Sequence, residues 1–191
     1  DIDELKSMVI KATRSLEKNP DDTASLKQRA LACLAMSDVL SARSAVKDLT
    51  RLLELEREDA ELYLLRAQAF KLLREKANFL SDARKAAELK PEVETRLTLV
   101  EALSENGDLT EAMAKCEEAL TFSPNDADAL STKAFCHLQM HDYQAGIADA
   151  EKALAIEPEH GAAYAYRGDC YEALKQYDKA LKDYTKSIKF N

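Results

Sequence analysis

Apolar residues recur at intervals of three and four along most of the chain, which is the spacing of one face of an α-helix. In residues 161–191 this pattern occurs twice. Tyr164, Gly168 and Tyr171 share one face, and Ala180 and Tyr184 share another after a short polar turn. The pattern predicts two helices that form an antiparallel hairpin with partly apolar outer surfaces. Such a pair cannot bury its apolar surface alone, so it needs neighbouring pairs.

The same pattern recurs along the chain with a nearly constant period. Residues 127–158 align with the last pair without a gap at a spacing of 34 residues. The residues that close successive units lie 37, 34, 33 and 34 positions apart and are Pro20, Arg57, Pro91, Pro124 and Pro158. The chain is therefore predicted to be all-α with about eleven helices. We expect a lone helix of a partial repeat in 1–22 and five repeats at 23–59, 60–92, 93–126, 127–160 and 161–191.

The repeat resembles the tetratricopeptide repeat (TPR), whose pattern is aromatic-x2-Leu-Gly-x2-Tyr, then Ala-x3-Phe, then Pro. The matching residues are Tyr164, Gly168, Tyr171, Ala180, Tyr184 and Pro158, with Arg167 in place of the Leu. The resemblance implies an α-solenoid, a right-handed superhelix of antiparallel helix pairs, as one array over 1–191. It also implies that the function is to bind another protein.

Two units depart from the regular pattern. The unit from Thr23 to Asp59 has about three additional residues, which we expect in the turn at 36–41. In the next unit Phe79 occupies the slot of a small residue and Ala83 the slot of a large one, an exchange that conserves volume. We expect the following unit to turn at Asn106-Gly107-Asp108.

Composition narrows the class of protein. No run of 18 apolar residues and no N-terminal signal segment is present, so we expect no membrane partner. The four cysteines form no C-x-x-C pair and fall in small apolar slots, which favours unpaired thiols in a reducing, cytoplasmic setting and no metal site. The chain begins without Met and in the middle of the pattern, so we expect it to be part of a longer protein.

Charge is distributed unevenly along the chain. Residues 1–92 carry 17 acidic and 17 basic side chains, residues 93–160 carry 14 and 4, and residues 161–191 carry 4 and 6. A nucleic-acid partner needs a basic surface, so we expect none. The acidic stretch could steer a basic partner to the third and fourth full repeats, or it could only aid solubility. Both interpretations remain open at this point.

The candidate site follows from the resemblance, because the first helices of TPR pairs line the concave face where partners bind. Phe135 and Tyr166 lie one repeat apart and could anchor a partner segment, extended or helical and possibly basic. The alternative is that both rings pack against neighbouring helices. The predicted groove residues are Lys27, Leu64, Gln68, Lys71, Leu97, Glu101, Phe135, Leu138, Tyr166, Asp169 and Glu172.

Other functions have weaker support. No register of the repeats supplies the cationic cluster with which some TPR domains clamp a chaperone's C-terminal carboxylate. His137 and His141 have a zinc-compatible spacing but lack the Glu of an H-E-x-x-H site, so a packed core histidine is the preferred interpretation of His137. We therefore expect no enzyme activity and no cofactor. The alternatives are a scaffolding or targeting arm of a larger enzyme or co-chaperone, and self-association through Ile188 and Phe190 at an uncapped end, unless a further helix follows.

Overall fold

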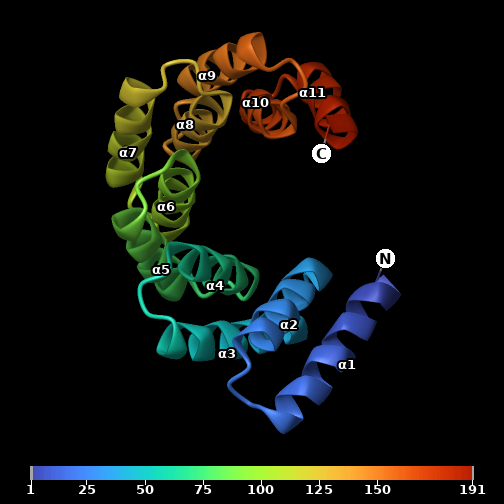
Figure 1. The fold of residues 1–191 in the computed structure, drawn as a ribbon. Helices are drawn as coiled ribbons and strands as arrows, with labels where there is room; N and C mark the ends of the chain where they lie inside the picture. Colours follow the sequence, from blue (N-terminus) through green and yellow to red (C-terminus); the bar gives the residue numbers. More distant parts are fainter. Residues whose placement is uncertain (1, 191) are drawn as a thin grey trace. The chain divides into compact units, whose positions relative to one another are not determined.

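The computed structural model describes residues 2–190, with the side chain of Val93 excepted, and shows helices joined by short turns (Figure 1). No strand occurs within these residues, so the all-α prediction is confirmed. The eleven helices in this range are α1 (Ile2–Lys18), α2 (Thr23–Met36), α3 (Val39–Leu55), α4 (Ala60–Leu72), α5 (Lys76–Leu89), α6 (Val93–Asn106), α7 (Leu109–Phe122), α8 (Ala127–Gln139), α9 (Tyr143–Ile156), α10 (Gly161–Ala173) and α11 (Tyr177–Phe190).

The helices form two compact units, unit 1 (Asp1–Thr95) and unit 2 (Arg96–Asn191). In unit 1 each helix from α1 to α5 packs against the next one along the chain. In unit 2 the same holds from α7 to α11, and α8 also packs against α10. The contact between α8 and α10 brings first helices of successive repeats together, as the repeat pattern predicts. A single array over 1–191 stays a prediction.

Each unit has an apolar core at the positions that the three-four spacing indicates. In unit 1, Leu49, Leu52 and Leu62 are almost fully covered, and in unit 2 the core includes Leu130 and several alanines. All four cysteines are free and buried, in agreement with the predicted small apolar slots. Burial raises the pKa of Cys170 to about 11, so this thiol stays protonated at neutral pH.

The additional residues of the first full repeat lengthen a helix and do not lengthen the turn. α3 has 17 residues, whereas the second helices of the four following repeats have 14. The turn before it contains only Ser37 and Asp38, and the Asp38 carboxylate accepts hydrogen bonds from the backbone N–H groups of Leu40 and Ser41. The prediction of a longer turn at 36–41 is wrong because Asp38 caps the helix early and adds a turn at its start.

Side-chain caps set the first residue of several helices. The carboxylates of Asp22, Asp59, Asp126 and Asp142 accept hydrogen bonds from backbone N–H groups in the first turns of α2, α4, α8 and α9. His160 takes this place in α10. Its Nδ1 accepts from the N–H of Ala163 at 3.2 Å, and its Nε2 lies 2.9 Å from Asp128 Oδ1. Because Nδ1 accepts, Nε2 carries the proton and donates to Asp128.

A recurrent buried ion pair joins the two helices of three repeats. In each pair the arginine donates through Nε and Nη2 to both oxygens of one carboxylate at 2.7–2.8 Å. Two of these arginines also donate to a threonine of the preceding second helix, at 3.1 Å. Bidentate pairs of this kind fix the angle between helices as well as adding energy. The pairs are Arg29–Asp48, Arg66–Asp82 and Arg167–Asp183.

Candidate partner-binding site

Seven of the predicted groove residues lie on the first helices of unit 2. α6 and α8 are neighbours at Ser104 Oγ and Cys136 Sγ, which are 3.5 Å apart, and α8 packs against α10. Six of the seven side chains are half-buried and Glu172 is exposed. We call this set the α6–α8–α10 face; its residues are Leu97, Glu101, Phe135, Leu138, Tyr166, Asp169 and Glu172.

Phe135 and Tyr166 pack against each other within this face. Their ring centroids are 5.1 Å apart and the ring planes are tilted by 38°. Both residues remain half-buried, so part of each stays open to solvent. Each ring contacts a neighbouring helix, as the packing interpretation expects, and still contributes to the surface. The role of the rings as partner anchors stays a prediction. The paired rings have a fixed orientation, which suits them to act as a contact site with little loss of entropy on binding.

The surroundings of Tyr166 are acidic. Burial raises its pKa to about 12, and the nearby carboxylates of Glu101 and Asp169 act in the same direction. The phenol is therefore neutral at physiological pH. A cationic group that approached this ring would also approach both carboxylates, so the face combines apolar contact with negative charge.

Asp169 and Glu172 are held by a tyrosine of the following helix. Tyr184 Oη is 2.7 Å from Asp169 Oδ1 and 2.6 Å from Glu172 Oε2, and its single proton is shared between them. Burial, then these two carboxylates, raise the pKa of Tyr184. The ring lies over Gly168, where an added Cβ would be 2.8 Å from ring atom Cε1. Sequence analysis missed this link, although glycine at 168 opposite tyrosine at 184 indicates it.

The four predicted groove residues of unit 1 differ in exposure. Lys27 Nζ forms an ion pair with Glu61 Oε1 at 3.0 Å, and Gln68 and Lys71 are exposed. Leu64 is only 9% exposed, so little of its side chain is open to a partner, and its role as a contact stays a prediction. The reason for the low exposure is that α4 packs against α3 and α5 and also contacts α2. Packing against α5 alone, the other helix of its pair, would leave more of its surface open.

The two histidines of the fourth full repeat do not share a helix face. α8 ends at Gln139, and His141 lies in the following turn with φ of 62°, its Nδ1 2.9 Å from Tyr143 Oη. His137 is half-buried, and its Nε2 is 3.4 Å from Asp149 Oδ2. The preferred interpretation of His137 as a core residue needs correction, because it sits beside a carboxylate at the edge of the core. Residues 2–190 contain no group of three or more side chains placed to hold a metal ion.

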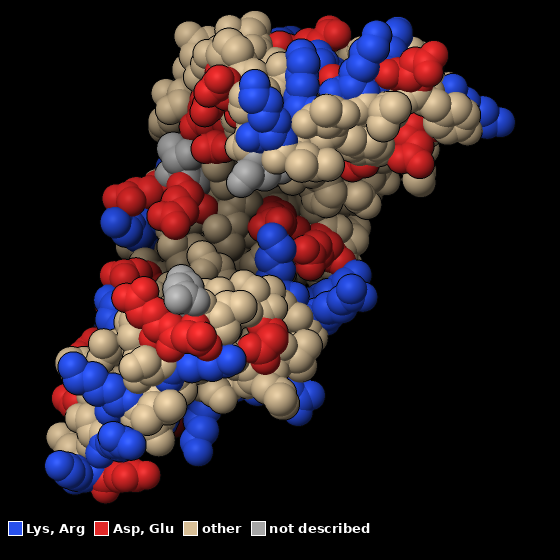
Figure 2. Space-filling model, turned by 90° about the vertical axis from the view of Figure 1, so that its right-hand side faces the viewer, with Lys and Arg blue, Asp and Glu red and all other residues tan. Residues whose placement is uncertain are grey.

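Charge differs between the two units. In the lower part of Figure 2, which α1 to α3 occupy, blue and red side chains are interspersed. Surface ion pairs such as Lys27–Glu61 and Arg51–Asp21 account for part of this mixture. In unit 2 the acidic excess of residues 93–160 coincides with α6 to α9, while α11 carries four lysines.

In the described part of the chain, no helix is both long enough and apolar enough to cross a membrane.

Comparison with known proteins supports the repeat assignment. Residues 161–191 match the tetratricopeptide repeat family. A crystal structure of a tetratricopeptide repeat protein from Parabacteroides merdae ATCC 43184 aligns with 98% of this chain and 73% of its own, with a TM-score of 0.85 and 20% identity. The last repeat therefore matches the tetratricopeptide repeat family, and the described helices have the fold of a tetratricopeptide repeat structure.

Two further TPR structures share the fold with this chain. A thermophilic TPR protein from Thermus thermophilus is 16% identical over 86% of this chain and 90% of its own, with a TM-score of 0.72. YrrB, described as a TPR protein with an unusual peptide-binding site, is 18% identical over 94% and 92%, with a TM-score of 0.58. Among curated proteins, no sequence matches this chain. Identities this low show the fold alone.

Proposed function

We propose that this TPR protein is a non-catalytic adaptor that binds a segment of another protein on the α6–α8–α10 face. The observation that carries the proposal is the Phe135–Tyr166 pair, which is packed, oriented and partly open. Aromatic residues that are held rigidly and surrounded by polar groups concentrate binding energy at interfaces. The peptide-binding site named for YrrB supports the proposal by analogy of fold.

The carboxylates beside the rings define the chemistry of the partner segment. Asp169 and Glu172 share one donated proton from Tyr184, so most of their acceptor positions remain for a bound group. With Glu101 they place three acids around an apolar patch. The segment that fits is extended or helical, with one apolar side chain for the rings and Lys or Arg next to it.

The same charges oppose capture of a C-terminal carboxylate. A carboxylate clamp needs several cations that converge on one point. The α6–α8–α10 face presents Glu101, Asp169 and Glu172 in the outward positions of α6 and α10. An anionic tail would be repelled there, so the proposed partner is not an acidic chaperone tail.

Site-specific photocrosslinking in the native cell tests this proposal. A photoreactive residue replaces Leu138, which is half-buried on the α6–α8–α10 face. In the control it replaces Lys175, which is exposed in the turn before α11. We expect discrete adducts from position 138 that disappear in the Phe135→Ala/Tyr166→Ala background. Equal adducts from both positions, or adducts that persist in that background, would contradict the proposal.

Self-association is a second candidate function, favoured by the exposed side chain of Ile188. Leu120 and Leu154 hold the equivalent positions of the two preceding repeats and are partly buried against a core cluster that includes Ala127 and Ala163. Ile188 is 81% exposed. Phe190 contributes less than the sequence indicated, because its ring is half-buried and stacks on Tyr164 with centroids 5.9 Å apart. Light scattering over a concentration series would show a growing mass for the wild type and a constant mass for Ile188→Lys; a constant mass for both would exclude this candidate.

A further inference from the structure

A second recessed surface lies on the last helix pair, away from the α6–α8–α10 face. It is a pocket of about 510 Å³ between α10 and α11. Its lining contains four cationic side chains and one acid, together with an aromatic ring and a hydroxyl. We call it the α10–α11 pocket; its residues are Arg167, Tyr171, Lys179, Lys182, Asp183, Thr185 and Lys186.

The lysines of this pocket lack acidic partners. Within residues 2–190 no carboxylate lies within ion-pair distance of Lys179, Lys182 or Lys186. Asp183 is already occupied by Arg167, whose Nη1 is also 4.0 Å from Glu151 Oε1. Within the described residues, no carboxylate therefore neutralises the three ammonium groups.

Two of the lysines are positioned by tyrosine rings. Lys179 Nζ lies 5.1 Å from the ring centroid of Tyr171, and Lys186 Nζ lies 4.9 Å from that of Tyr164. Contacts of this kind restrict a lysine without neutralising its charge. The pocket thus has cations whose directions are partly fixed before a ligand arrives.

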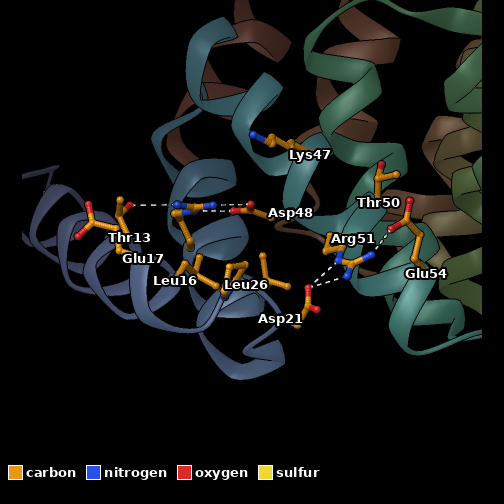
Figure 3. A pocket seen from close by; sticks show the side chains of 12 residues that line it. Thr13, Leu16, Glu17, Asp21, Leu26, Lys47, Asp48, Thr50, Arg51 and Glu54 are labelled. Atoms are coloured by element: carbon orange, nitrogen blue, oxygen red, sulfur yellow. Dashed lines mark hydrogen bonds and ion pairs between the residues drawn. The ribbon is translucent and has the colours of Figure 1, made fainter.

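The equivalent pocket of the first full repeat has the opposite balance of charge, with more acidic than basic side chains in its lining. It measures about 770 Å³ and is lined by Arg29, Lys47, Asp48, Thr50 and Arg51, which correspond to Arg167, Lys182, Asp183, Thr185 and Lys186. Figure 3 shows Arg51 between Asp21 and Glu54, with which it forms ion pairs at 2.7 Å. Glu17 also lines this pocket.

The repeat alignment places Ala155 at the position of Glu17 and Lys189 at the position of Glu54. Two acids of the pocket of the first full repeat, Glu17 and Glu54, therefore have no acidic counterpart in the last repeat. Glu159 stands at the position of Asp21, but it does not line the α10–α11 pocket. The fold does not require this change, because the Arg–Asp pair at the base is the same in both. The exposed cations are thus particular to the last pair.

We propose that the α10–α11 pocket is a second docking surface, which binds an acidic segment of a partner protein. Carboxylates of the segment approach Lys179, Lys182 and Lys186, and an apolar side chain lies on Tyr171. This surface is complementary in charge to the α6–α8–α10 face, which takes a basic segment. The chain would then join two segments of opposite charge through one unit.

Fluorescence anisotropy with the full chain tests the proposal. The probe is a labelled short peptide of Asp, Glu and Leu, with the matching Asn, Gln and Leu peptide as its neutral counterpart. The test variant is Lys182→Glu/Lys186→Glu. The control is Lys18→Glu/Lys175→Glu, which changes the net charge equally at two exposed lysines outside the pocket.

We expect the acidic peptide to bind the wild type and to bind the test variant about tenfold or more weakly, with weaker binding in higher salt. The Kd of the control for the acidic peptide should stay within about twofold of the wild-type value. Phe135→Ala/Tyr166→Ala should bind the acidic peptide as tightly as the wild type does, which separates this surface from the proposed function. No binding, equal binding of the neutral peptide, or equal weakening in the control would overturn the proposal. Displacement of the peptide by inorganic phosphate at equal concentration would also overturn it, because the site would then hold a small anion.

Discussion

The buried Arg66–Asp82 pair gives the sharpest test of how the helix pairs are held together. The Asp82 side chain is 6% exposed and that of Arg66 is 18% exposed, and two charge-assisted hydrogen bonds of 2.7 and 2.8 Å join them. Asp82→Ala removes the acceptor and leaves the guanidinium between the rings of Tyr63 and Phe70 with only the Thr50 hydroxyl as a partner.

Removal of one member of a buried pair costs about 3–5 kcal/mol, because the other charge is left without compensation. The partial exposure of Arg66 lets water reach it, so we expect Asp82→Ala to lower the free energy of unfolding by about 3 kcal/mol. Lys85→Ala on the same helix is the matched control. It removes a surface pair of 3.2 Å with Glu88 and should cost less than about 1 kcal/mol.

Urea unfolding followed by circular dichroism measures both variants. The double variant Arg66→Leu/Asp82→Ala should be more stable than Asp82→Ala alone, because it removes the uncompensated charge. Leu99 already stands at the equivalent position of the next repeat, which shows that the fold accepts an aliphatic side chain there. If Asp82→Ala were as stable as Lys85→Ala, the pair would contribute only surface electrostatics and the reasoning would fail.

Three further predictions concern unit 2. Gly168→Ala should lower the free energy of unfolding by about 1–3 kcal/mol, because its Cβ would lie 2.8 Å from the Tyr184 ring; an unchanged urea midpoint would show that the ring moves freely. Lys175→Gly should raise the melting temperature through a gain of about 1 kcal/mol, because Lys175 has φ of 59° in the turn before α11, and a lower melting temperature would contradict this. The pKa of Tyr166 is raised to about 12 in the folded chain, so its contribution to stability is complete below about pH 10 and is lost as pH rises toward 12. Tyr166→Phe should therefore lose less stability than the wild type over this alkaline range. An identical loss in both proteins would refute the shift.

The helix pattern was readable from the sequence because burial in each pair depends on local spacing. The period of about 34 residues placed eleven helices, and Asp22 was recognisable as a cap before Thr23. The extra turn of α3 was not predictable from length alone, because three additional residues can extend either a loop or a helix. Only the capping geometry of Asp38 decides between them.

The candidate site was partly readable for the same reason. Phe135 and Tyr166 could be placed on neighbouring first helices, but whether their rings meet depends on side-chain directions. The low exposure of Leu64 could not be predicted, because its burial depends on other helices of unit 1. The recurrence of Arg29, Arg66 and Arg167 was visible in the sequence, and the matching aspartates in the second helices would have identified the ion pairs.

The most direct test of the central claim is a calorimetric titration of the segment that crosslinks to position 138. The wild-type chain is compared with Phe135→Ala/Tyr166→Ala, whose folding is checked by circular dichroism. We predict that the double variant binds the segment more weakly by roughly 2 kcal/mol, which is about thirtyfold in Kd. An unchanged Kd would contradict the claim that the aromatic pair is where this protein holds its partner.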